Sequence, residues 1–600
     1  MSYVLNDPAD FADESAAGFV AAHRSLVRRV PGGVARAAAT PAGQVAIVIG
    51  GGSGHYPAFG GLVGAGLAHA AAMGNVFASP SAQQVYAVAK SVATDAGVLL
   101  SYGNYAGDVL NFDQAEARLI AEGIPCRTVR VTDDIYSAAP HEREKRRGVA
   151  GDLAVFRAAA WAAERGLDLA AVAAIAERAN ARTRSLGVAF TGCTLPGATE
   201  PLFTIPAGQM GVGMGIHGEP GIDVRPLARA DELGQLFVDG LLGELPDDIE
   251  TLRGARAAVI LNGLGAVKSE ELFVIYATVA QLLEAAGVVV VEPEVGEYAT
   301  SFEMAGVSLT LFWLDEELEA AWASPAYTPA YRKGAVAGAS ELHGAGGDQA
   351  DAVPAPETAS VATAGADPDL DSEFSISEAS DESVAAAVVV VEVMHAIRDV
   401  IDRDADELGR LDAIAGDGDH GIGMQRGARA AATAATRAQL AGAGAGTVLA
   451  LAGDAWALRA GGTSGALWGA GLRAAGERIG DALAPDARAL ADAVDAARAT
   501  VQGYGKAEVG DKTLVDALVP FVDGLRRGVA DGQGTVETWI AAAADATAAA
   551  AATSELEPKL GRARPHVQKS LGTPDPGAVS FARAMTAAGR VLAALREERS

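Results

Sequence analysis

The stretch "QVAIVIGGGSG" (residues 44–54) joins an apolar, β-branched run to a glycine-rich turn, which indicates a buried strand that ends in a loop. The same order recurs in "GVLLSYG" (97–103), "AAVILNGLG" (257–265) and "GVVVVEP" (287–293), with helical stretches between these segments. Repetition of strand, glycine loop and helix predicts an N-terminal α/β domain. In such a domain, functional residues gather at the carboxyl ends of the strands.

The C-terminal third of the chain has a different texture, because it is rich in alanine and nearly free of strand signals. In its first segment Val390, Val393 and Ile397 recur at helical spacing, which predicts an all-α domain. Between Lys333 and Arg398 there is no basic residue, and Ala, Pro, Ser and Asp dominate. Such a composition favours a flexible linker. We therefore predict three parts, at 1–340 (α/β domain), 341–381 (acidic Ala/Pro-rich linker) and 382–600 (all-α domain).

The overall composition excludes several functional classes. The 600 residues hold 47 Lys and Arg against 76 Asp and Glu, a formal net charge of −29. This balance argues against nucleic acid as a partner, because phosphate binding needs a basic face. No signal peptide and no transmembrane run are evident, and the apolar stretch 384–397 contains Glu392 and His395. We expect a cytoplasmic protein without a membrane partner, in which Cys126 and Cys193 are buried thiols.

The common nucleotide-binding and hydrolase motifs are absent. The chain contains no GxxxxGK[ST], HExxH or GxSxG pattern and no protein-kinase signature. The segment "GMGIHG" (213–218) satisfies GxGxxG, but Pro220 follows two residues later. A dinucleotide site requires a helix at that point, so a turn is the better interpretation.

One acidic segment of the C-terminal domain is a candidate metal site. "LDAIAGDGDHGIGM" (411–424) places Asp412, Asp417 and Asp419 within eight residues. Carboxylates this close repel one another unless a hard cation lies among them. A calcium hand is excluded, because its twelfth position would be Gly423 or Ala428 and not Glu. Spacing alone leaves a solvated acidic turn as the alternative.

Three loops of the same domain strengthen the metal interpretation. They are "RAGGTSGALWGAG" (459–471), "YGKAEVGDKTLVDALVP" (504–520) and "GRARPHVQKSLGTPDPGAVS" (561–580). Backbone amides at a helix N-terminus can receive phosphate, and the first loop precedes helix-forming residues. Together with the aspartates, the loops suggest a Mg²⁺–nucleotide site between helices.

Three loops of the N-terminal domain carry polar side chains. "GGGSGHYP" (50–57) offers His55, "YGNYAGDVLNF" (102–112) offers Asp108, and "GIHGEPG" (215–221) offers His217. A single histidine in a glycine-rich turn is usually structural. Two histidines and an aspartate that follow strands are a stronger signal, because strand ends converge in such folds.

These segments, in this order, resemble the dihydroxyacetone kinases of the single-chain, ATP-using type. "GGGSGH", "GNVFASPS" (74–81), "AGDVLNF", "TGCTLPG" (191–197) and "GIHGEPG" resemble the substrate-binding half of that family. "LDAIAGDGDHG", "GGTSGALWG", "GDKTLVDAL" and "GTPDPGA" resemble its nucleotide-binding half. The likeness covers nearly the whole chain apart from the linker.

The resemblance implies a mechanism. The histidine that matches His217 adds through its ring nitrogen to the ketose carbonyl carbon and forms a hemiaminal, which explains why glycerol is not captured. The aspartate that matches Asp108 accepts the proton of the attacking hydroxyl group, and the histidine that matches His55 orients that group. The implied helical domain is an antiparallel barrel, the implied cofactors are ATP and two Mg²⁺ ions, and the implied assembly is a homodimer.

The resemblance also assigns the remaining site residues. The expected substrate contacts are Gly52, Ser53, Gly54, His55, Asp108 and His217. The expected nucleotide contacts are His420, Gly421, Ile422, Gly423, Thr463, Ser464, Gly505, Leu514, Arg562, Asp575, Pro576 and Gly577. The expected metal ligands are Asp412, Asp417 and Asp419.

Two departures from the family pattern concern substrate choice. The family commonly has Glu after the loop histidine and Lys five residues before the loop aspartate, where this chain has Tyr56 and Gly103. Both changes alter polarity beside the expected ligand, so the four-carbon ketose erythrulose stands beside dihydroxyacetone as a candidate. Alternatives to a ketose kinase are an FAD-splitting nucleotide cyclase, a ligand-binding regulator without turnover and a fatty-acid kinase.

Overall fold

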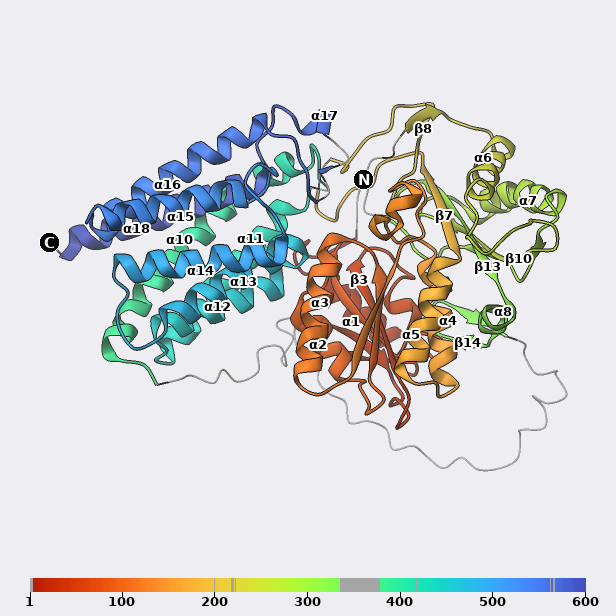
Figure 1. The fold of residues 1–600 in the computed structure, drawn as a ribbon, viewed down its shortest axis with the longest axis horizontal. Helices are drawn as coiled ribbons and strands as arrows, with labels where there is room; N and C mark the ends of the chain where they lie inside the picture. The colour runs from red at the N-terminus through yellow and green to blue at the C-terminus, as the bar shows by residue number, and fades with distance from the viewer. Residues whose placement is uncertain are drawn as a thin grey trace.

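The computed structural model describes residues 4–198, 200–216, 221, 223–334, 378–416, 418–561, 563–564 and 567–599. Three of the expected site residues, His217, Asp417 and Arg562, lie outside this part of the chain, as does most of the predicted linker. The described residues form an N-terminal domain that contains all the strands and a C-terminal domain made of helices (Figure 1).

The first sheet of the N-terminal domain contains the strand that precedes the first glycine loop. Its strand order is β1-β2-β4-β3-β5-β6, and β3 pairs in parallel with both β4 and β5. The strands are β1 (Val27–Val30), β2 (Gly33–Arg36), β3 (Ala46–Ser53), β4 (Ala70–Val76), β5 (Val98–Gly103) and β6 (Cys126–Val131). Each of these parallel strands is followed by a loop at the same edge of the sheet, as the sequence predicted.

Helices cover both faces of this sheet. They are α1 (Phe11–Ala22), α2 (Ala82–Lys90), α3 (Ala106–Ala121), α4 (Asp152–Glu164) and α5 (Leu169–Ala181), with short 3-10 turns at Gly60–Leu62 and Pro140–Lys145. Residues of α2 and α3 pack with one set of alternating strand residues, and residues of α4 and α5 pack with the other set. Two-sided burial explains why the strands are continuously apolar in the sequence.

The second sheet is mainly antiparallel, which the alternation of strands and helices did not indicate. Its order is β11-β10-β13-β7-β8-β9, and β13 runs antiparallel to both β10 and β7. The strands are β7 (Thr183–Ala189), β8 (Gln209–Val212), β9 (Asp223–Pro226), β10 (Arg256–Gly263), β11 (Val289–Val290), β12 (Glu294–Gly296) and β13 (Gly306–Leu314). The apolar run 287–293 contributes only the two-residue edge strand β11, where Val289 is exposed.

Further elements complete this domain. They are the helices α6 (Ala230–Leu242), α7 (Ser269–Ala285) and α8 (Glu316–Ala323), and the hairpin of β14 (Ala326–Tyr327) and β15 (Arg332–Lys333). Residues of α6 and α7 bury the apolar face of the second sheet around Phe237, Leu272 and Trp313. The α/β class predicted for this half of the chain is confirmed.

The C-terminal domain is a closed ring of helices. Its elements are α10 (Asp381–Asp412), α11 (His420–Leu440), α12 (Ala445–Ala460), α13 (Gly462–Ile479), α14 (Ala487–Gly505), α15 (Val515–Ala530), α16 (Thr535–Ala552), a 3-10 turn (Thr553–Glu555), α17 (Val567–Ser570) and α18 (Pro576–Arg599). Consecutive long helices pack on one another, and α18 closes the ring against α10. Figure 1 shows the long helices side by side, so the expected antiparallel helical barrel is confirmed.

Small side chains explain the tight packing of this barrel. The small residues Ala431 and Ala435 are fully buried between its helices, and the larger rings of Trp456 and Phe521 fill its core.

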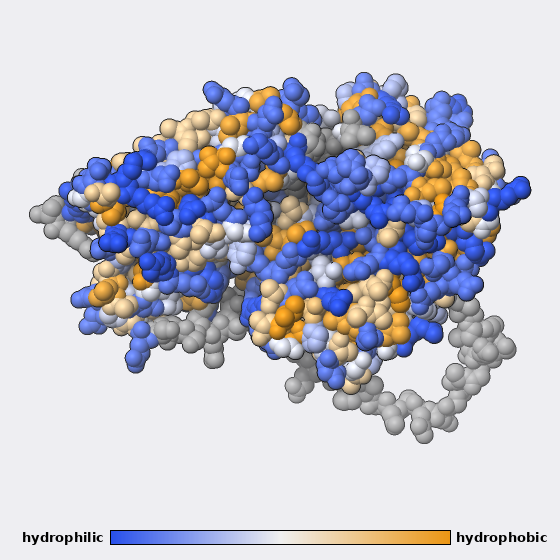
Figure 2. Space-filling view, in the orientation of Figure 1, coloured by the Kyte–Doolittle hydropathy of each residue, from blue (hydrophilic) through white to orange (hydrophobic). Residues whose placement is uncertain are grey.

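In the described chain one helix segment, Pro576–Arg596, is long and apolar enough to be compared with a membrane span. This segment belongs to α18, which packs against α10 and α16 as a core helix of the barrel. Figure 2 shows hydrophilic residues spread over this face of both domains, between scattered hydrophobic patches.

Candidate functional site

The first glycine loop holds His55 in a buried pocket of aromatic rings. Its Nδ1–H donates a hydrogen bond of 2.7 Å to the carbonyl oxygen of Thr300. Its ring stacks on Phe77, with 4.9 Å between the ring centroids. Because a carbonyl oxygen can only accept, this bond fixes the tautomer, and Nε2 is the ring nitrogen that can accept a proton. His55 is therefore oriented by the backbone of a distant segment.

Close packing accounts for two of the glycines beside His55. A Cβ atom on Gly52 would lie 2.8 Å from the backbone of Phe77. Gly54 has φ +98°, and a Cβ atom there would lie 2.7 Å from the ring of Phe302. The neighbouring Ser53 donates its hydroxyl hydrogen to the carbonyl oxygen of Gly74 at 2.6 Å. Substrate contact by these three loop residues stays a prediction, because packing alone requires the glycines.

Asp108 lies in the first turn of α3, directly after β5, and is 6 % exposed. Since β3 and β5 are neighbouring parallel strands, the segments that carry His55 and Asp108 leave the sheet at the same edge. The structure thus places two of the three predicted ketose-site side chains on segments that follow adjacent strands. The third, His217, lies outside the described residues.

The two positions that depart from the family pattern have clear surroundings. The ring of Tyr56 is half exposed and packs edge-on against Phe19. Gly103 is the last residue of β5, and a Cβ atom on it would lie 3.2 Å from the ring of Tyr105. The hydroxyl group of Tyr105 donates a bond of 2.8 Å to the carbonyl oxygen of Gly148. The space beside Gly103 is therefore partly filled by Tyr105.

The first histidine of α11 connects two helices of the barrel. His420 is buried, with its Nδ1 3.1 Å from the hydroxyl of Ser464 and its Nε2 2.9 Å from the hydroxyl of Ser580. Burial lowers the pKa of His420, so the ring is neutral at pH 7. The adjacent Gly421 is required by helix packing, because a Cβ atom on it would lie 2.0 Å from the carbonyl oxygen of Ala405.

Two of the carboxylates expected to bind metal are described: Asp412 is the last residue of α10, and Asp419 directly precedes α11. The backbone N–H of His420 donates to Asp412 Oδ2 at 3.3 Å. Burial, with a smaller contribution from the charge of Asp412, raises the pKa of Asp419 to about 7. Burial also raises the pKa of Asp575 to about 7, with a smaller contribution from Asp412. A divalent cation would relieve this crowding, so the donor set fits Mg²⁺.

The described residues alone do not complete a metal site, since no group of three metal-ligating side chains occurs among them. Asp412 and Asp419 contribute two carboxylates, and Asp417 lies outside the described residues. The fit to Mg²⁺ therefore rests on the repulsion between the described carboxylates. The set of three ligands stays a prediction.

The segment before α18 lies near Asp412, because the charge of Asp412 contributes to the raised pKa of Asp575. Asp575 Oδ1 accepts the N–H of Ala578 at 2.7 Å, and a Cβ atom on Gly577 would lie 3.6 Å from the Cβ of Leu514. Sequence reasoning missed Lys512, whose buried amino group donates to the carbonyl oxygen of Ser570 at 2.6 Å. The lysine fixes the loop "GDKT" to the last residue of α17. The position of Lys512 inside the motif "GDKTLVDAL" (510–518) could have pointed to it.

The two candidate sites meet across a direct contact between the domains. The N–H of Gly462 donates to the carbonyl oxygen of Ser79 at 3.2 Å. Asn111 Nδ2 donates to the carbonyl oxygen of Gly462 at 3.3 Å. A Cβ atom on Gly107 would lie 3.4 Å from the backbone nitrogen of Thr463. The glycine-rich start of α13 therefore rests against the start of α3, next to Asp108.

This contact could not be found from the sequence, because Ser79, Gly107 and Asn111 all lie more than 350 residues before Gly462. A second contact supports it at the N-terminus. Arg459 pairs with Asp13 at 3.5 Å, and Arg426 donates to the carbonyl oxygen of Ala9 at 2.5 Å. The described contacts thus join the two domains at several points.

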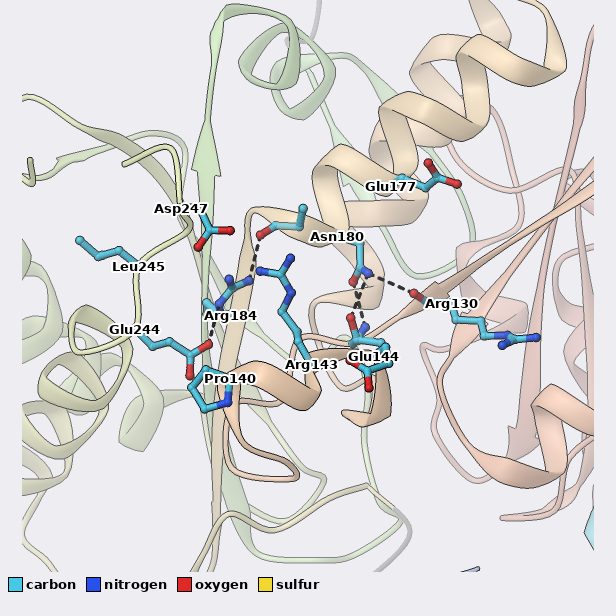
Figure 3. A pocket seen from close by; sticks show the side chains of 12 residues that line it. Arg130, Pro140, Arg143, Glu144, Glu177, Asn180, Arg184, Glu244, Leu245 and Asp247 are labelled. Carbon is cyan, nitrogen blue, oxygen red and sulfur yellow. Dashed lines mark hydrogen bonds and ion pairs between the residues drawn. The ribbon is translucent and has the colours of Figure 1, made fainter. Parts of the chain in front are cut away.

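A cavity of about 610 Å³ lies elsewhere in the N-terminal domain (Figure 3). Its lining includes Arg130, Arg143, Arg184 and Glu244, and none of the predicted site residues. The charges of two arginines are already paired, Arg184 with Glu244 and Arg130 with Asp113. The domain contact, which lies beside Asp108 and includes Thr463, is therefore the better candidate for the active site.

Comparisons with known proteins identify the two domains. Residues 17–330 match the Dak1 domain and residues 414–590 match the DAK2 domain. The chain is 57 % identical over 592 residues to the L-erythrulose kinase of Pectobacterium atrosepticum, covering 99 % of this chain and 97 % of the relative. It is 51 % identical to the D-erythrulose kinase of Mycolicibacterium smegmatis, covering 97 % of both chains.

A solved structure extends the likeness to the fold. The dihydroxyacetone kinase of C. freundii in complex with AMP-PNP and Mg²⁺ is 30 % identical, with a TM-score of 0.50. The alignment covers 98 % of this chain and 99 % of that chain.

The chain combines an α/β domain with a helical barrel, and the two domains contact each other. Together with the matched domain families, this architecture defines a two-domain kinase of small carbonyl compounds. The chain belongs to the single-chain dihydroxyacetone/erythrulose kinase family. The cyclase, regulator and fatty-acid kinase alternatives are not favoured, because relatives that match over nearly their whole length are named kinases of a short ketose.

Proposed function

We propose that this protein transfers the γ-phosphoryl group of ATP to a terminal hydroxyl group of erythrulose. The observation that carries the proposal is the domain contact, in which the loop of Gly462 and Thr463 rests on the start of α3 beside Asp108. Phosphoryl transfer depends on positioning donor and acceptor, and this contact brings a loop expected to hold nucleotide against the loop expected to hold the base.

Asp108 and His55 have different roles toward the attacking hydroxyl group. The attacking hydroxyl oxygen forms a bond to the γ-phosphorus while the bond from that phosphorus to the bridging oxygen of ADP breaks. The hydroxyl proton passes to the carboxylate of Asp108. His55, oriented by Thr300, positions the hydroxyl group. Because both side chains are buried, water is kept from competing as the acceptor.

Capture of the ketose is assigned to His217 by the family resemblance. One ring nitrogen adds to the carbonyl carbon, the other loses its proton, and the carbonyl oxygen gains one, so the adduct is a neutral hemiaminal. A polyol has no carbonyl group and cannot form it. This step makes the enzyme selective for ketoses over glycerol.

Nucleotide binding is assigned to the end of the barrel at which α10 ends and α11 begins. His420, Ser464 and Asp575 and their neighbouring loops would contact ATP. Asp412, Asp417 and Asp419 would hold two Mg²⁺ ions, which supply charge neutralisation at the phosphate oxygens when bound. The AMP-PNP and Mg²⁺ complex of the 30 % identical kinase supports this assignment.

We choose erythrulose over dihydroxyacetone as the proposed substrate because relatives at 57 % and 51 % identity carry erythrulose kinase names. The absence of the family lysine at Gly103 agrees with a change of substrate at this site. We further propose a cytoplasmic homodimer, in line with the family resemblance.

A coupled assay for ADP release with Mg·ATP tests the proposal. The panel contains D-erythrulose, L-erythrulose, dihydroxyacetone and glycerol, each over a range of concentrations. We expect the highest kcat/KM with one erythrulose enantiomer, a lower value with dihydroxyacetone and no turnover with glycerol. Equal turnover of glycerol and the ketoses would contradict carbonyl capture. ADP release independent of every ketose would contradict the kinase itself.

A further inference from the structure

Asp152, the first residue of α4, carries a buried carboxyl group that the fold does not use. The residue is 2 % exposed, and within the described part of the chain neither carboxyl oxygen has a hydrogen-bond partner. Buried polar side-chain atoms in native proteins nearly always have a partner, so an exception calls for an explanation. A ligand hydroxyl group is one such explanation.

Other aspartates at helix starts show what a structural role looks like in this protein. Asp168 accepts the N–H of Ala171 at 2.9 Å, and Asp315 accepts the N–H of Leu318 at 2.8 Å. Both therefore cap their helices. Asp152 makes no such bond, and burial, with the charges of Asp133 and Asp108, raises its pKa well above the usual value. A protonated carboxyl group gains little from the helix dipole.

The neighbouring Asp133 provides a second comparison, since it is equally buried but fully bonded. Its Oδ1 accepts the N–H of Val149 at 2.9 Å, and its Oδ2 accepts the N–H of Gly151 at 2.9 Å. The hydroxyl group of Ser185 also donates to Oδ2. Asp133 thus holds the turn before α4 in place. The turn does not need the carboxyl group of Asp152.

The position of Asp152 relates it to the candidate ketose site. A Cβ atom on Gly148 would lie 2.8 Å from Asp152 Oδ1 and 2.4 Å from the Cα of Gly103. Gly103 ends β5 and begins the short segment that leads to Asp108. Asp152 therefore lies beside the position at which this chain lacks the family lysine. The family lysine is absent at Gly103, and the carboxyl group of Asp152, which the fold does not use, lies next to that position.

We propose that Asp152 is a specificity-determining residue whose carboxyl group hydrogen-bonds the hydroxyl group that a four-carbon ketose carries in addition to those of dihydroxyacetone. As a protonated acid it can donate to that hydroxyl oxygen, and its carbonyl oxygen can accept the hydroxyl hydrogen. The inference rests on the proposed function, since it concerns the choice of ketose at the same site. Asp108 remains the base, and Asp152 contributes to recognition.

Steady-state kinetics of Asp152→Ala and Asp152→Asn with erythrulose and dihydroxyacetone test this role. For Asp152→Ala we expect kcat/KM to fall by about 10- to 100-fold with erythrulose, mainly through KM, and by less than threefold with dihydroxyacetone. Asp152→Asn keeps a donor and an acceptor, so it should recover part of the loss. Equal losses with both ketoses, or an unchanged ratio, would overturn the inference.

Thermal unfolding gives a readout that a structural role would move in the opposite direction. Without ketose, Asp152→Ala should unfold at the same or a higher temperature than the wild type, because an unpaired buried acid is removed. Asp133→Asn is the matched control, and it should lower the unfolding temperature because its bonds support the turn. A clear loss of stability, or failure to fold, in both Asp152 variants would assign the residue to the fold and contradict the proposal.

The wild-type data separate the two levels of the argument. If the wild type phosphorylates erythrulose but Asp152→Ala keeps the wild-type preference between the ketoses, the inference alone fails. If the wild type phosphorylates no ketose, the proposed function fails and the inference falls with it.

Discussion

Substitution of Gly107 by valine should separate the two halves of the active site without unfolding either domain. A Cβ atom on Gly107 would lie 3.4 Å from the nitrogen of Thr463 and 3.4 Å from the Cβ of Ser79. These are ordinary contact distances, so Gly107→Ala should fit. Valine adds two methyl groups about 1.5 Å beyond the Cβ, where the loop of Gly462 and Thr463 already lies, and the domains must move apart by about 1 Å.

The size of the effect follows from the sensitivity of phosphoryl transfer to position. A misplacement of about 1 Å typically costs on the order of 10²-fold in rate, so Gly107→Val should lower kcat by that factor, and Gly107→Ala by less than about threefold. The assay is ADP release with saturating erythrulose and Mg·ATP. Calorimetric titration with erythrulose should show retained binding, because the change faces the helical domain.

A matched control is Gly18→Val in α1. Gly18 is also helical, and no atom lies within 4 Å of an added Cβ, so this variant should be fully active. The reasoning would be refuted if Gly107→Val kept its kcat within threefold of the wild type. Loss of ketose binding in this variant would instead indicate a local distortion of Asp108.

Two further predictions concern buried titratable groups. Burial lowers the pKa of His69 to about 3 while its Nδ1 accepts the N–H of Ile47, so the folded state binds fewer protons than the unfolded state between pH 6.5 and 3. As the pH is lowered through this window, the free energy of unfolding should therefore decrease by about 1.4 kcal/mol per pH unit. Between pH 7 and pH 5, the free energy of urea unfolding should decrease by about 2 kcal/mol less in His69→Gln than in the wild type. Equal decreases in both proteins would contradict the lowered pKa of His69. Asp419→Asn should abolish ATP turnover while erythrulose binding, measured by calorimetry, persists; near-normal turnover would remove Asp419 from the metal site.

The architecture could be predicted from the sequence because it depends on local patterns. The run 45–49 is apolar on both faces and precedes glycines, and the structure places most of it in the central parallel strand β3. Spacing of apolar residues in 390–401 likewise indicated a helix, and α10 forms there. The antiparallel second sheet was not indicated, since the direction of β13 depends on distant pairing with β7 and β10.

The candidate site could be predicted only in part. His55 and Asp108 follow strands in the sequence, so their common sheet edge was foreseeable. The bond between Gly462 and Ser79 joins residues of different domains, and no local pattern encodes it. The unused carboxyl group of Asp152 was equally invisible, because burial and the absence of partners are properties of the folded chain.

The central claim, transfer of phosphate from ATP to a ketose hydroxyl group with Asp108 as base, is tested most directly by ³¹P NMR of the reaction. Wild-type protein with Mg·ATP and erythrulose should form ADP and one sugar phosphate ester in equal amounts. Asp108→Asn should still bind erythrulose but form the ester about 10²- to 10⁴-fold more slowly. Ester formation by this variant at the wild-type rate, or release of inorganic phosphate in place of the ester by the wild type, would contradict the account.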